Sequence, residues 1–335
     1  MINIDKILKN ETQFKALTSL HLEEYESLLV FFRSRWYERH KHFSMLNKRR
    51  KKPLTAKQYL RPTQTLPSVE SKLLFILMLF KTGSIQQQLA AEFDLDQSHV
   101  SRWIKILLPV LHKAIVDCHC QPAQDMDELI QLFRRRHNDP PGGEPIITFN
   151  ADATVRPIGR SLDDETQRND YSGKHHRHVV KNTVICDEWQ FIHFAGQTWN
   201  GSIHDKAILE QELPSLEPLK AFELWFSKDK AYQKYRPDGV HLLEPFRASR
   251  GHPLSEVQKE YNTWVNSTRT VVEHAISGIK RLALVSGPMR YWKQSMRHQF
   301  FQIGCGIHNL RVRFRRHAYA SSAIRVRDNL NFSLT

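Results

Sequence analysis

Residues 146–154 read Ile-Ile-Thr-Phe-Asn-Ala-Asp-Ala-Thr, a short apolar run followed by an acidic residue, Asp152. Just before this run, residues 138–145 contain three prolines and two glycines, and neither a helix nor a strand can cross such a stretch. We therefore place a domain boundary there. After the boundary we predict a strand at Ile146–Asn150, with Asp152 near its C-terminal end.

The chain after this boundary alternates strand-like and helical patterns. β-Branched and aromatic runs predict strands, and amphipathic runs with helical spacing predict helices. The predicted strands are His178–Ile185, Trp189–Ala195 and Phe222–Ser227, and the predicted helices are Ile203–Glu212, Ser255–Leu284 and Ser295–Leu310. Asp187-Glu188 would form the turn between the first two of these strands. This mixture is typical of an α/β domain with a mixed sheet.

Three carboxylates in this domain are placed where they could share a site. Asp152 and Asp229 each follow an apolar strand-like run, and Glu273 lies in the long predicted helix. Carboxylates at the ends of neighbouring strands meet at one edge of a sheet, and a helix packed there can add a third. Oxygen ligands without cysteine select Mg²⁺ or Mn²⁺. Two such ions can stabilise both oxygens of an in-line phosphoryl displacement.

The helical carboxylate has basic neighbours on the same helix face. Arg269, Glu273 and Lys280 are separated by steps of four and seven residues. At ~100° per residue these steps return to within ~40° of one direction. Glu273 could therefore ligate a metal ion while the two cations hold phosphates. The alternative is an ordinary salt bridge on the helix surface, with a lysine beside it.

The first ~115 residues have a helical pattern, and residues 85–108 have the pattern of a helix-turn-helix. Ala90 and Ala91 would allow two helices to cross closely, Phe93–Leu95 fits the turn, and Asp96 would cap the second helix. Val100, Ile104 and Leu107 would face inward. The outward side chains, which are of the types that reach base edges and phosphates, are Gln97, Ser98, His99, Ser101, Arg102 and Lys105. Because the turn lacks the usual glycine, an ordinary helical hairpin is the alternative.

The charge of the chain favours a polyanionic partner. Its 335 residues contain 49 Lys and Arg against 35 Asp and Glu, a net charge of +14. Clustered Lys and Arg bind phosphate backbones by releasing counterions. A basic run, Lys48–Lys52, precedes Pro53 and reads as a loop, which could be a phosphate-contacting arm or a solvated tether.

Composition excludes several classes of protein. With 40% hydrophobic and 25% charged residues, the chain is neither disordered nor collagen-like. Four cysteines without zinc-like spacing indicate a reducing compartment. The longest apolar run, Leu73–Phe80, is a buried helix rather than a membrane span, and no signal peptide is expected at the N-terminus. We expect a soluble cytoplasmic protein that does not enter a membrane.

The motifs in order resemble those of DDE-type transposases of bacterial insertion sequences. The closest group is insertion sequence family five, which is similar to the Harbinger-type transposases. The matching blocks are Asp152–Ile158 around the first aspartate, Tyr171–His178 with Val180–Asn182 as a basic hairpin, Gly201–Asp205 as Gly-x-x-His-Asp, Asp229–Tyr232 around the second aspartate, and Arg269, Glu273 and Lys280 around the glutamate.

This resemblance implies a ribonuclease H-like catalytic domain behind an all-α helix-turn-helix domain. In such a domain Asp152, Asp229 and Glu273 would bind two Mg²⁺ ions, for which Mn²⁺ would substitute. Water, and later a DNA 3′-hydroxyl, would attack phosphodiester bonds. The supporting residues would be Arg269 and Lys280 at DNA phosphates, Lys174, Arg177 and Lys181 as DNA contacts, and His204 as an orienting or DNA-contacting residue. Asp205 is the competing candidate for the second carboxylate.

The expected organisation follows from these assignments. Residues 1–120 would form the DNA-binding domain, 121–145 a linker, 146–290 the catalytic domain, and 291–335 a helix with a basic tail that includes Arg311–Arg316. The protein would bind the terminal inverted repeats of its element as a dimer or larger assembly on double-stranded DNA, and would cut and join DNA in the bacterial cytoplasm. One alternative is an inactive, domesticated transposase that only binds specific DNA. Another is a nuclease of the same fold that acts outside transposition.

Overall fold

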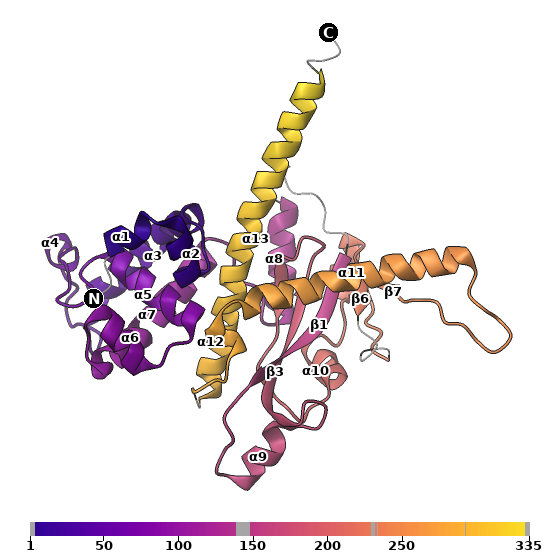
Figure 1. Ribbon diagram of the computed structural model, residues 1–335, viewed down its shortest axis with the longest axis horizontal. Coiled ribbons are helices and arrows are strands. Elements are labelled where there is room, and N and C mark those ends of the chain that lie inside the picture. Colours follow the sequence, from indigo (N-terminus) through magenta and orange to yellow (C-terminus); the bar gives the residue numbers. More distant parts are fainter. Residues whose placement is uncertain (1–3, 139–147, 229–231, 233, 292, 332–335) are drawn as a thin grey trace. The chain divides into compact units, whose positions relative to one another are not determined.

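The computed structural model describes residues 4–138, 148–228, 232, 234–291 and 293–331 (Figure 1). The chain forms two compact units. Unit 1 comprises Met1–Gln121 and Lys280–Gly287, and unit 2 comprises Pro122–Ile279 and Pro288–Thr335. None of the helices in the described ranges combines the length and apolar character needed to cross a bilayer.

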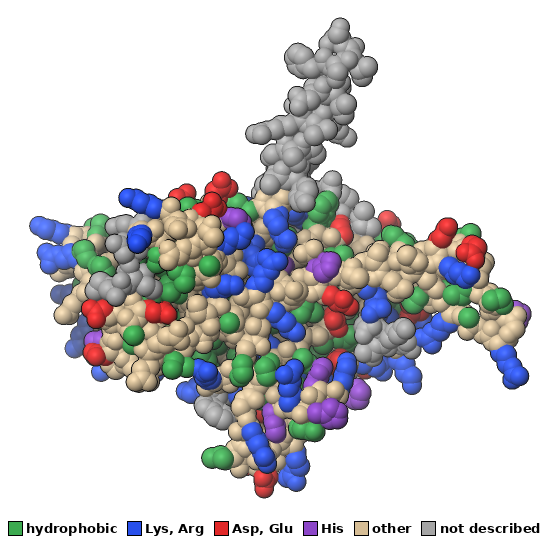
Figure 2. All heavy atoms as spheres, in the orientation of Figure 1, with side chains coloured by type: hydrophobic (Ala, Val, Ile, Leu, Met, Phe, Trp, Pro, Cys, Tyr) green, Lys and Arg blue, Asp and Glu red, His purple; other side chains and the backbone are tan. Residues whose placement is uncertain are grey.

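Unit 1 is helical. Its elements are α1 (Ile4–Leu8), α2 (Glu11–Thr18), α3 (Leu22–His42), α4 (Ala56–Tyr59), α5 (Val69–Thr82), α6 (Gln86–Phe93), α7 (Gln97–Asp117) and α12 (Ala283–Ser286). The central helix is α5, in which every residue from 71 to 80 is buried, as predicted for Leu73–Phe80. The Ser68 side chain caps its start by accepting from the Ser71 N–H (2.9 Å), and Gly83 ends it at φ 61°. Lys and Arg side chains project along the edge of this unit that carries α4 (Figure 2).

Unit 2 is built on a mixed sheet. Its described strands are β1 (Thr148–Pro157), β2 (Tyr171–Ser172), β3 (Arg177–Cys186), β4 (Ile192–Ala195), β5 (Trp199–Asn200), β6 (Trp225–Lys228) and β7 (His241–Leu243). The order is β2-β3-β1-β6-β7, with β4 and β5 also paired to β3. Strand β3 runs antiparallel to β1, whereas β6 and β7 run parallel to it. The turn predicted at Asp187-Glu188 does join the antiparallel strands β3 and β4.

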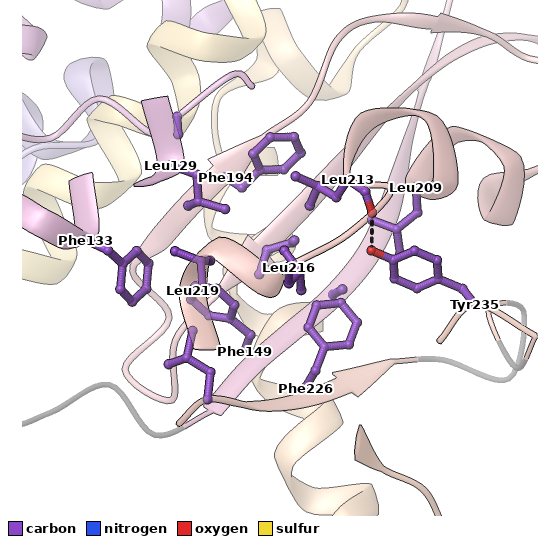
Figure 3. Close-up of a cluster of buried hydrophobic side chains, with 14 of the residues drawn as sticks. Leu129, Phe133, Phe149, Phe194, Leu209, Leu213, Leu216, Leu219, Phe226 and Tyr235 are labelled. Atoms are coloured by element: carbon purple, nitrogen blue, oxygen red, sulfur yellow. Dashed lines mark hydrogen bonds between the residues drawn. The ribbon is translucent and has the colours of Figure 1, made fainter. Parts of the chain in front are cut away.

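Helices accompany this sheet. They are α8 (Met126–Asn138), α9 (Asp164–Asp170), α10 (Asp205–Glu212), the 3₁₀ helix η1 (Glu217–Phe222), α11 (Glu256–Lys280) and α13 (Gln294–Asn331). Side chains from α8, α10 and η1 pack on one face of the sheet, where Phe149 of β1 and Phe226 of β6 contribute to a buried apolar cluster (Figure 3). Within this cluster the Tyr235 hydroxyl donates to the Leu213 carbonyl oxygen (2.5 Å).

Strand β1 differs from the predicted strand. Its first expected residues, 146 and 147, lie outside the described residues, and the strand continues to Pro157. Asp152 therefore lies inside β1 and not beyond its end. The reason is that β1 has neighbours of different length: the parallel pairing with β6 covers residues 148–151, whereas the antiparallel pairing with β3 covers residues 150–157.

Two connecting segments differ from the predicted boundaries. The expected linker, residues 121–145, contains the helix α8, because Leu129 and Phe133 lie four residues apart and are both buried in the core of unit 2. The expected basic tail continues the helix α13. Arg311, 7% exposed, donates to the Gly278 carbonyl oxygen (3.3 Å), and Arg316 pairs with the buried Asp187 (3.6 Å).

Candidate active site

Residues from two elements far apart in the sequence line one small pocket of unit 2. Asp152 comes from β1 and Glu273 from α11, which crosses the sheet beside β1 and β6 (Figure 1). The pocket has a volume of about 30 Å³, which is the size of a site for a water molecule or a small ion. Its lining residues are Asn150, Ala151, Asp152, Ser227, Arg269, Val272 and Glu273.

The alternation of β1 explains why Asp152 faces this pocket. Phe149 and Ala151 point to the apolar core, so Asn150 and Asp152 point to the opposite face. The Asp152 Oδ1 accepts a hydrogen bond from the Ala153 N–H (2.7 Å). The parallel pairing pairs Asn150 with Ser227 and ends one residue before Asp152.

The position of Glu273 follows from the buried face of α11. The residues of this face are Val265, Val272, Ala275, Ile276, Gly278 and Ile279. Glu273 lies next to Val272 at the edge of the face and is exposed, and Arg269, one turn earlier, is half-buried. The Thr268 hydroxyl lies 3.4 Å from the Ser227 hydroxyl, which joins α11 to the end of β6.

Asn150 is a residue of the pocket that sequence reasoning missed. Its side chain is 1% exposed, and neither Oδ1 nor Nδ2 has a hydrogen-bond partner among the described residues. A buried amide without partners is costly, and such groups concentrate at sites that bind a ligand or water. The available signal was its position two residues before Asp152, because residues i and i+2 of a strand share a face.

The predicted second aspartate, Asp229, lies outside the described residues. The residue before it, Lys228, is described: its ammonium is buried, pairs with Glu244 (3.2 Å) and donates to the Tyr235 carbonyl oxygen. Within the part of the chain that the structure describes, no three His, Cys, Asp or Glu residues cluster as metal ligands. The described part of the pocket thus offers two carboxylates.

The predicted helix-turn-helix is present in unit 1 as α6 and α7. Asp94 stands where the turn usually has glycine, and it adopts the left-handed conformation itself (φ 53°, ψ 54°). Asp is one of the few residues that tolerate this conformation. The Leu95 N–H then donates to the Ala90 carbonyl oxygen (2.9 Å) and ends α6.

The two faces of α7 are as predicted. Val100, Ile104 and Leu107 are buried. The residues predicted to contact DNA are all accessible: Gln97, Ser98 and Lys105 are exposed, and His99, Ser101 and Arg102 are half-buried. Asp96 occupies the N-cap position, but its side chain makes no capping hydrogen bond and its carboxylate instead lies 3.6 Å from Nδ1 of His99.

Comparison with known proteins identifies both units. Residues 64–116 match the family model described as the helix-turn-helix of DDE superfamily endonuclease, and residues 151–309 match the model described as DDE superfamily endonuclease. Together these two matches assign the chain to the family of DDE transposases. It is 23% identical over 224 residues, 66% of this chain and 73% of its relative, to a probable transposase for insertion sequence element IS702 from Microchaete diplosiphon. No solved structure matches it significantly.

The Gly-x-x-His-Asp block of this transposase has a structural role in unit 2. Asp205 is the first residue of α10, and its carboxylate pairs with the Lys181 ammonium (2.9 Å). Lys181 is 6% exposed and also donates to the Ile203 carbonyl oxygen (2.7 Å). The prediction that Lys181 contacts DNA is therefore wrong, because position 181 of β3 faces inward. Asp205 does not line the pocket that contains Asp152.

The other predicted basic and polar residues of the transposase are accessible. Tyr171 pairs with His178 across the β2–β3 hairpin, and Lys174 and Arg177 in this hairpin are exposed. His204, which precedes α10, is exposed. Lys280 is the last residue of α11 and is also exposed.

Proposed function

We propose that this DDE transposase cuts and joins DNA at the ends of its insertion element, with Asp152, Asp229 and Glu273 as the ligands of two Mg²⁺ ions. The observation that carries the proposal is the pocket that Asp152 and Glu273 share, although they lie 121 positions apart in the sequence. The pairing of Lys228 with Ala151 supports Asp229 as the third ligand, because Asp229 is the next residue of the chain after Lys228.

The sheet supports a ribonuclease H-like catalytic domain. A central strand, β1, has an antiparallel hairpin on one side and two parallel strands on the other, and the helix with the glutamate packs against it. We propose this fold for unit 2. The finer assignment to insertion sequence family five rests on the order of the sequence motifs alone.

The residues of the pocket fit a hard divalent cation. Its donors are carboxylate, amide and hydroxyl oxygens, from Asp152, Glu273, Asn150 and Ser227, and oxygen donors are those that Mg²⁺ prefers. The Asn150 amide oxygen has no other partner among the described residues. Bound Mg²⁺ would favour deprotonation of the attacking water and offset the charge that develops on the phosphate.

The remaining residues would bind and orient DNA. Arg269 lines the pocket and Lys280 lies on the same face of α11, so both can pair with phosphates that flank the scissile bond. The exposed residues of α7 would read the terminal inverted repeat from the major groove. Lys174 and Arg177 would contact phosphates. Because two element ends must be joined, we propose a dimer or larger assembly on DNA.

A cleavage assay tests this function. The purified protein is incubated with linear DNA that carries the ends of its element, with Mg²⁺, with Mn²⁺ or with EDTA. We expect metal-dependent cleavage that is lost in Asp152→Asn, Asp229→Asn and Glu273→Gln, while DNA binding is retained. Glu260→Gln, an exposed glutamate on the same helix as Glu273, is the matched control and should cleave normally.

Two outcomes would contradict the proposal. Cleavage by Asp152→Asn at the rate of the parent protein would remove this pocket from the chemistry. Specific binding of the ends without cleavage under any metal would leave a DNA-binding protein on an inactive catalytic fold.

A further inference from the structure

One segment of unit 1 carries a concentration of positive charge that the proposed function does not use. Between Glu38 and Glu70 the chain contains nine Lys and Arg residues and neither Asp nor Glu. They are Arg39, Lys41, Lys48, Arg49, Arg50, Lys51, Lys52, Lys57 and Arg61. The sequence alone leaves open whether this basic run is a phosphate-contacting arm or a tether.

In the structure, residues 42–50 of this stretch form an ordered turn. Phe43 and Arg49 form an antiparallel bridge, the Ser44 N–H donates to the Lys48 carbonyl oxygen (2.9 Å), and the Arg50 N–H donates to the His42 carbonyl oxygen (2.8 Å). Asn47 supplies the left-handed residue of the turn at φ 60°. We call residues 41–52 the basic hairpin. Its shape is fixed at the end of α3.

The base of the basic hairpin is held by Arg39, the residue of α3 that reaches back over it. The Arg39 Nη2 donates to the Ser44 carbonyl oxygen (2.8 Å) and to the Asn47 side-chain oxygen (3.2 Å). At the other side Lys48, Arg49, Lys51 and Lys52 are exposed. They lie in the stretch just before α4. Figure 2 shows Lys and Arg side chains along the edge of unit 1 that carries α4.

A second group of basic side chains, which is buried, accompanies these exposed residues. Among the described residues, Arg39 Nη1, His40 Nδ1 and Arg50 Nε are buried without a hydrogen-bond partner. His40 is 8% exposed and stacks on Trp36 (ring centroids 5.2 Å apart). The Lys72 ammonium lies over the same Trp36 ring (4.8 Å).

The nearest carboxylates in the sequence are committed elsewhere. Glu38 pairs with Arg35 (2.8 Å), and Glu70 pairs with Arg33 (2.7 Å). Burial first, and neighbouring positive charge second, disfavour the charged forms of these side chains: burial and Arg50 lower the pKa of Arg39 to about 10. Burial, together with Arg50, Arg39 and Lys72, lowers the pKa of His40 to about 4. An anion bound at the hairpin would relieve this repulsion.

We propose that the basic hairpin is a second DNA contact of the transposase, which grips the phosphate backbone while α7 reads bases. The proposal rests on the proposed function, because it takes the DNA bound by α7 as its ligand. Exposed Lys and Arg on a fixed backbone suit phosphates, which carry no sequence information. Packing connects the two contacts: Trp36 at the base of the hairpin lies against Trp103 of α7 (ring centroids 5.8 Å apart), the residue after Arg102.

The test is the salt dependence of DNA binding by the full-length protein in EDTA. Fluorescence anisotropy is recorded with labelled element-end DNA and with a scrambled duplex of equal length. In the triple variant Arg49→Ala, Lys51→Ala, Lys52→Ala we expect both affinities to fall by the same factor. The slope of log affinity against log salt should become shallower by ~0.9 per lost phosphate contact, or about 2.7 for three.

Two further variants make the result specific. A control with the same loss of charge, Lys9→Ala, Lys15→Ala, Lys113→Ala, removes three exposed lysines of unit 1 outside the hairpin and should leave the slope nearly unchanged. Arg102→Ala should weaken binding to the element end more than to the scrambled duplex. Circular dichroism checks that each variant is folded.

The outcomes separate this inference from the proposed function. If the parent protein does not prefer the element end, the proposed function fails. If it does, and the hairpin variant keeps the parent slope or behaves like the charge-matched control, only the hairpin contact is refuted. A loss confined to the element-end sequence would also refute it, because the hairpin would then read bases. The same assay with labelled single-stranded RNA tests another ligand. If the parent protein binds this RNA as tightly as the element-end DNA or more tightly, and the triple variant does not bind it, the hairpin is assigned to RNA and the DNA contact is refuted.

Discussion

Arg156 shows how a single residue of a family motif can serve the fold instead of the chemistry. It lies four residues after Asp152 and is completely buried. Its guanidinium donates to the Asn182 side-chain oxygen (2.7 Å) and to the Arg297 carbonyl oxygen (2.9 Å), and it stacks on Phe301 (4.8 Å). It thus joins β1 to β3 and to α13. From the sequence alone it would pass for one more DNA-binding arginine.

Glu212 gives unit 2 a pH-dependent stability. Its Oε1 accepts from the Gln197 N–H (2.6 Å) and from the Trp199 indole N–H (2.7 Å). Burial raises the pKa of this carboxyl above its ordinary value of 4.5, although these hydrogen bonds oppose the rise. The folded state therefore holds the proton more tightly than the unfolded state. The resulting stability is fully present below pH 4.5 and is lost as pH rises through the raised pKa.

Replacing Glu212 by glutamine should remove this dependence. The glutamine amide keeps the accepting oxygen and carries no charge. The free energy of unfolding of Glu212→Gln should therefore increase relative to that of the parent as pH rises from about 4.5 towards neutrality. Urea unfolding across this range measures the difference. Glu210→Gln, on the same helix but exposed and paired with Lys206, is the control. A difference that does not change with pH would contradict the assignment to Glu212.

The turn between α6 and α7 is an element whose stability depends on one backbone conformation. Asp94 adopts φ 53°, so Asp94→Gly should raise the free energy of unfolding, by up to about 1 kcal/mol. Asp94→Val should lower it by about 1–2 kcal/mol, because a β-branched residue is strained there. Asp94→Asn tolerates the conformation without the charge and should match the parent. Thermal unfolding that ranks valine with asparagine would refute the strain argument.

Most elements of this chain could be predicted because their signals are local. The buried helix at Leu73–Phe80 is apolar throughout, and the strands that became β3 and β4 are rich in β-branched and aromatic residues, respectively. The ends of the elements were harder to predict, because they depend on the strands and hydrogen-bond acceptors that the folded chain places beside them. β1 continues past Asp152 because β3 pairs with it, and α13 continues past Leu310 because Arg311 and Arg316 find acceptors in unit 2.

The candidate site was predictable to a similar degree. The helical spacing and the apolar strand pointed to Glu273 and Asp152, and both line the pocket. The part played by Lys181 was not predictable, because a lysine near the exposed basic residues of the β2–β3 hairpin looks accessible until the pairing with Asp205 is seen. Asn150 gave only the weak signal of strand alternation. Its importance comes from its buried and unpartnered amide, which is a property of the folded chain.

At the scale of the whole molecule, two separate stretches of the chain build unit 1. Residues 280–287 belong to unit 1, although they directly follow the helix that carries Glu273. Their helix, α12, packs on α5. The Lys81 ammonium donates to the Arg281 carbonyl oxygen (3.1 Å), and a Cβ added to Gly83 would come within 3.2 Å of Ala283. Unit 1, which contains the helix-turn-helix, therefore includes a segment encoded after Glu273.

This arrangement predicts that a change at residue 284 will destabilise unit 1 selectively. Leu284 is 8% exposed, and Leu284→Ala should lower the free energy of unfolding of this unit by about 2–4 kcal/mol. Hydrogen exchange read by mass spectrometry should show faster exchange in α5 and α7 and unchanged exchange in β1 and β3. Val257→Ala, which removes an exposed side chain from α11, should change neither. Equal loss of protection in both units would mean that residues 280–287 support the whole chain, and unchanged protection in α5 would mean that unit 1 folds without them.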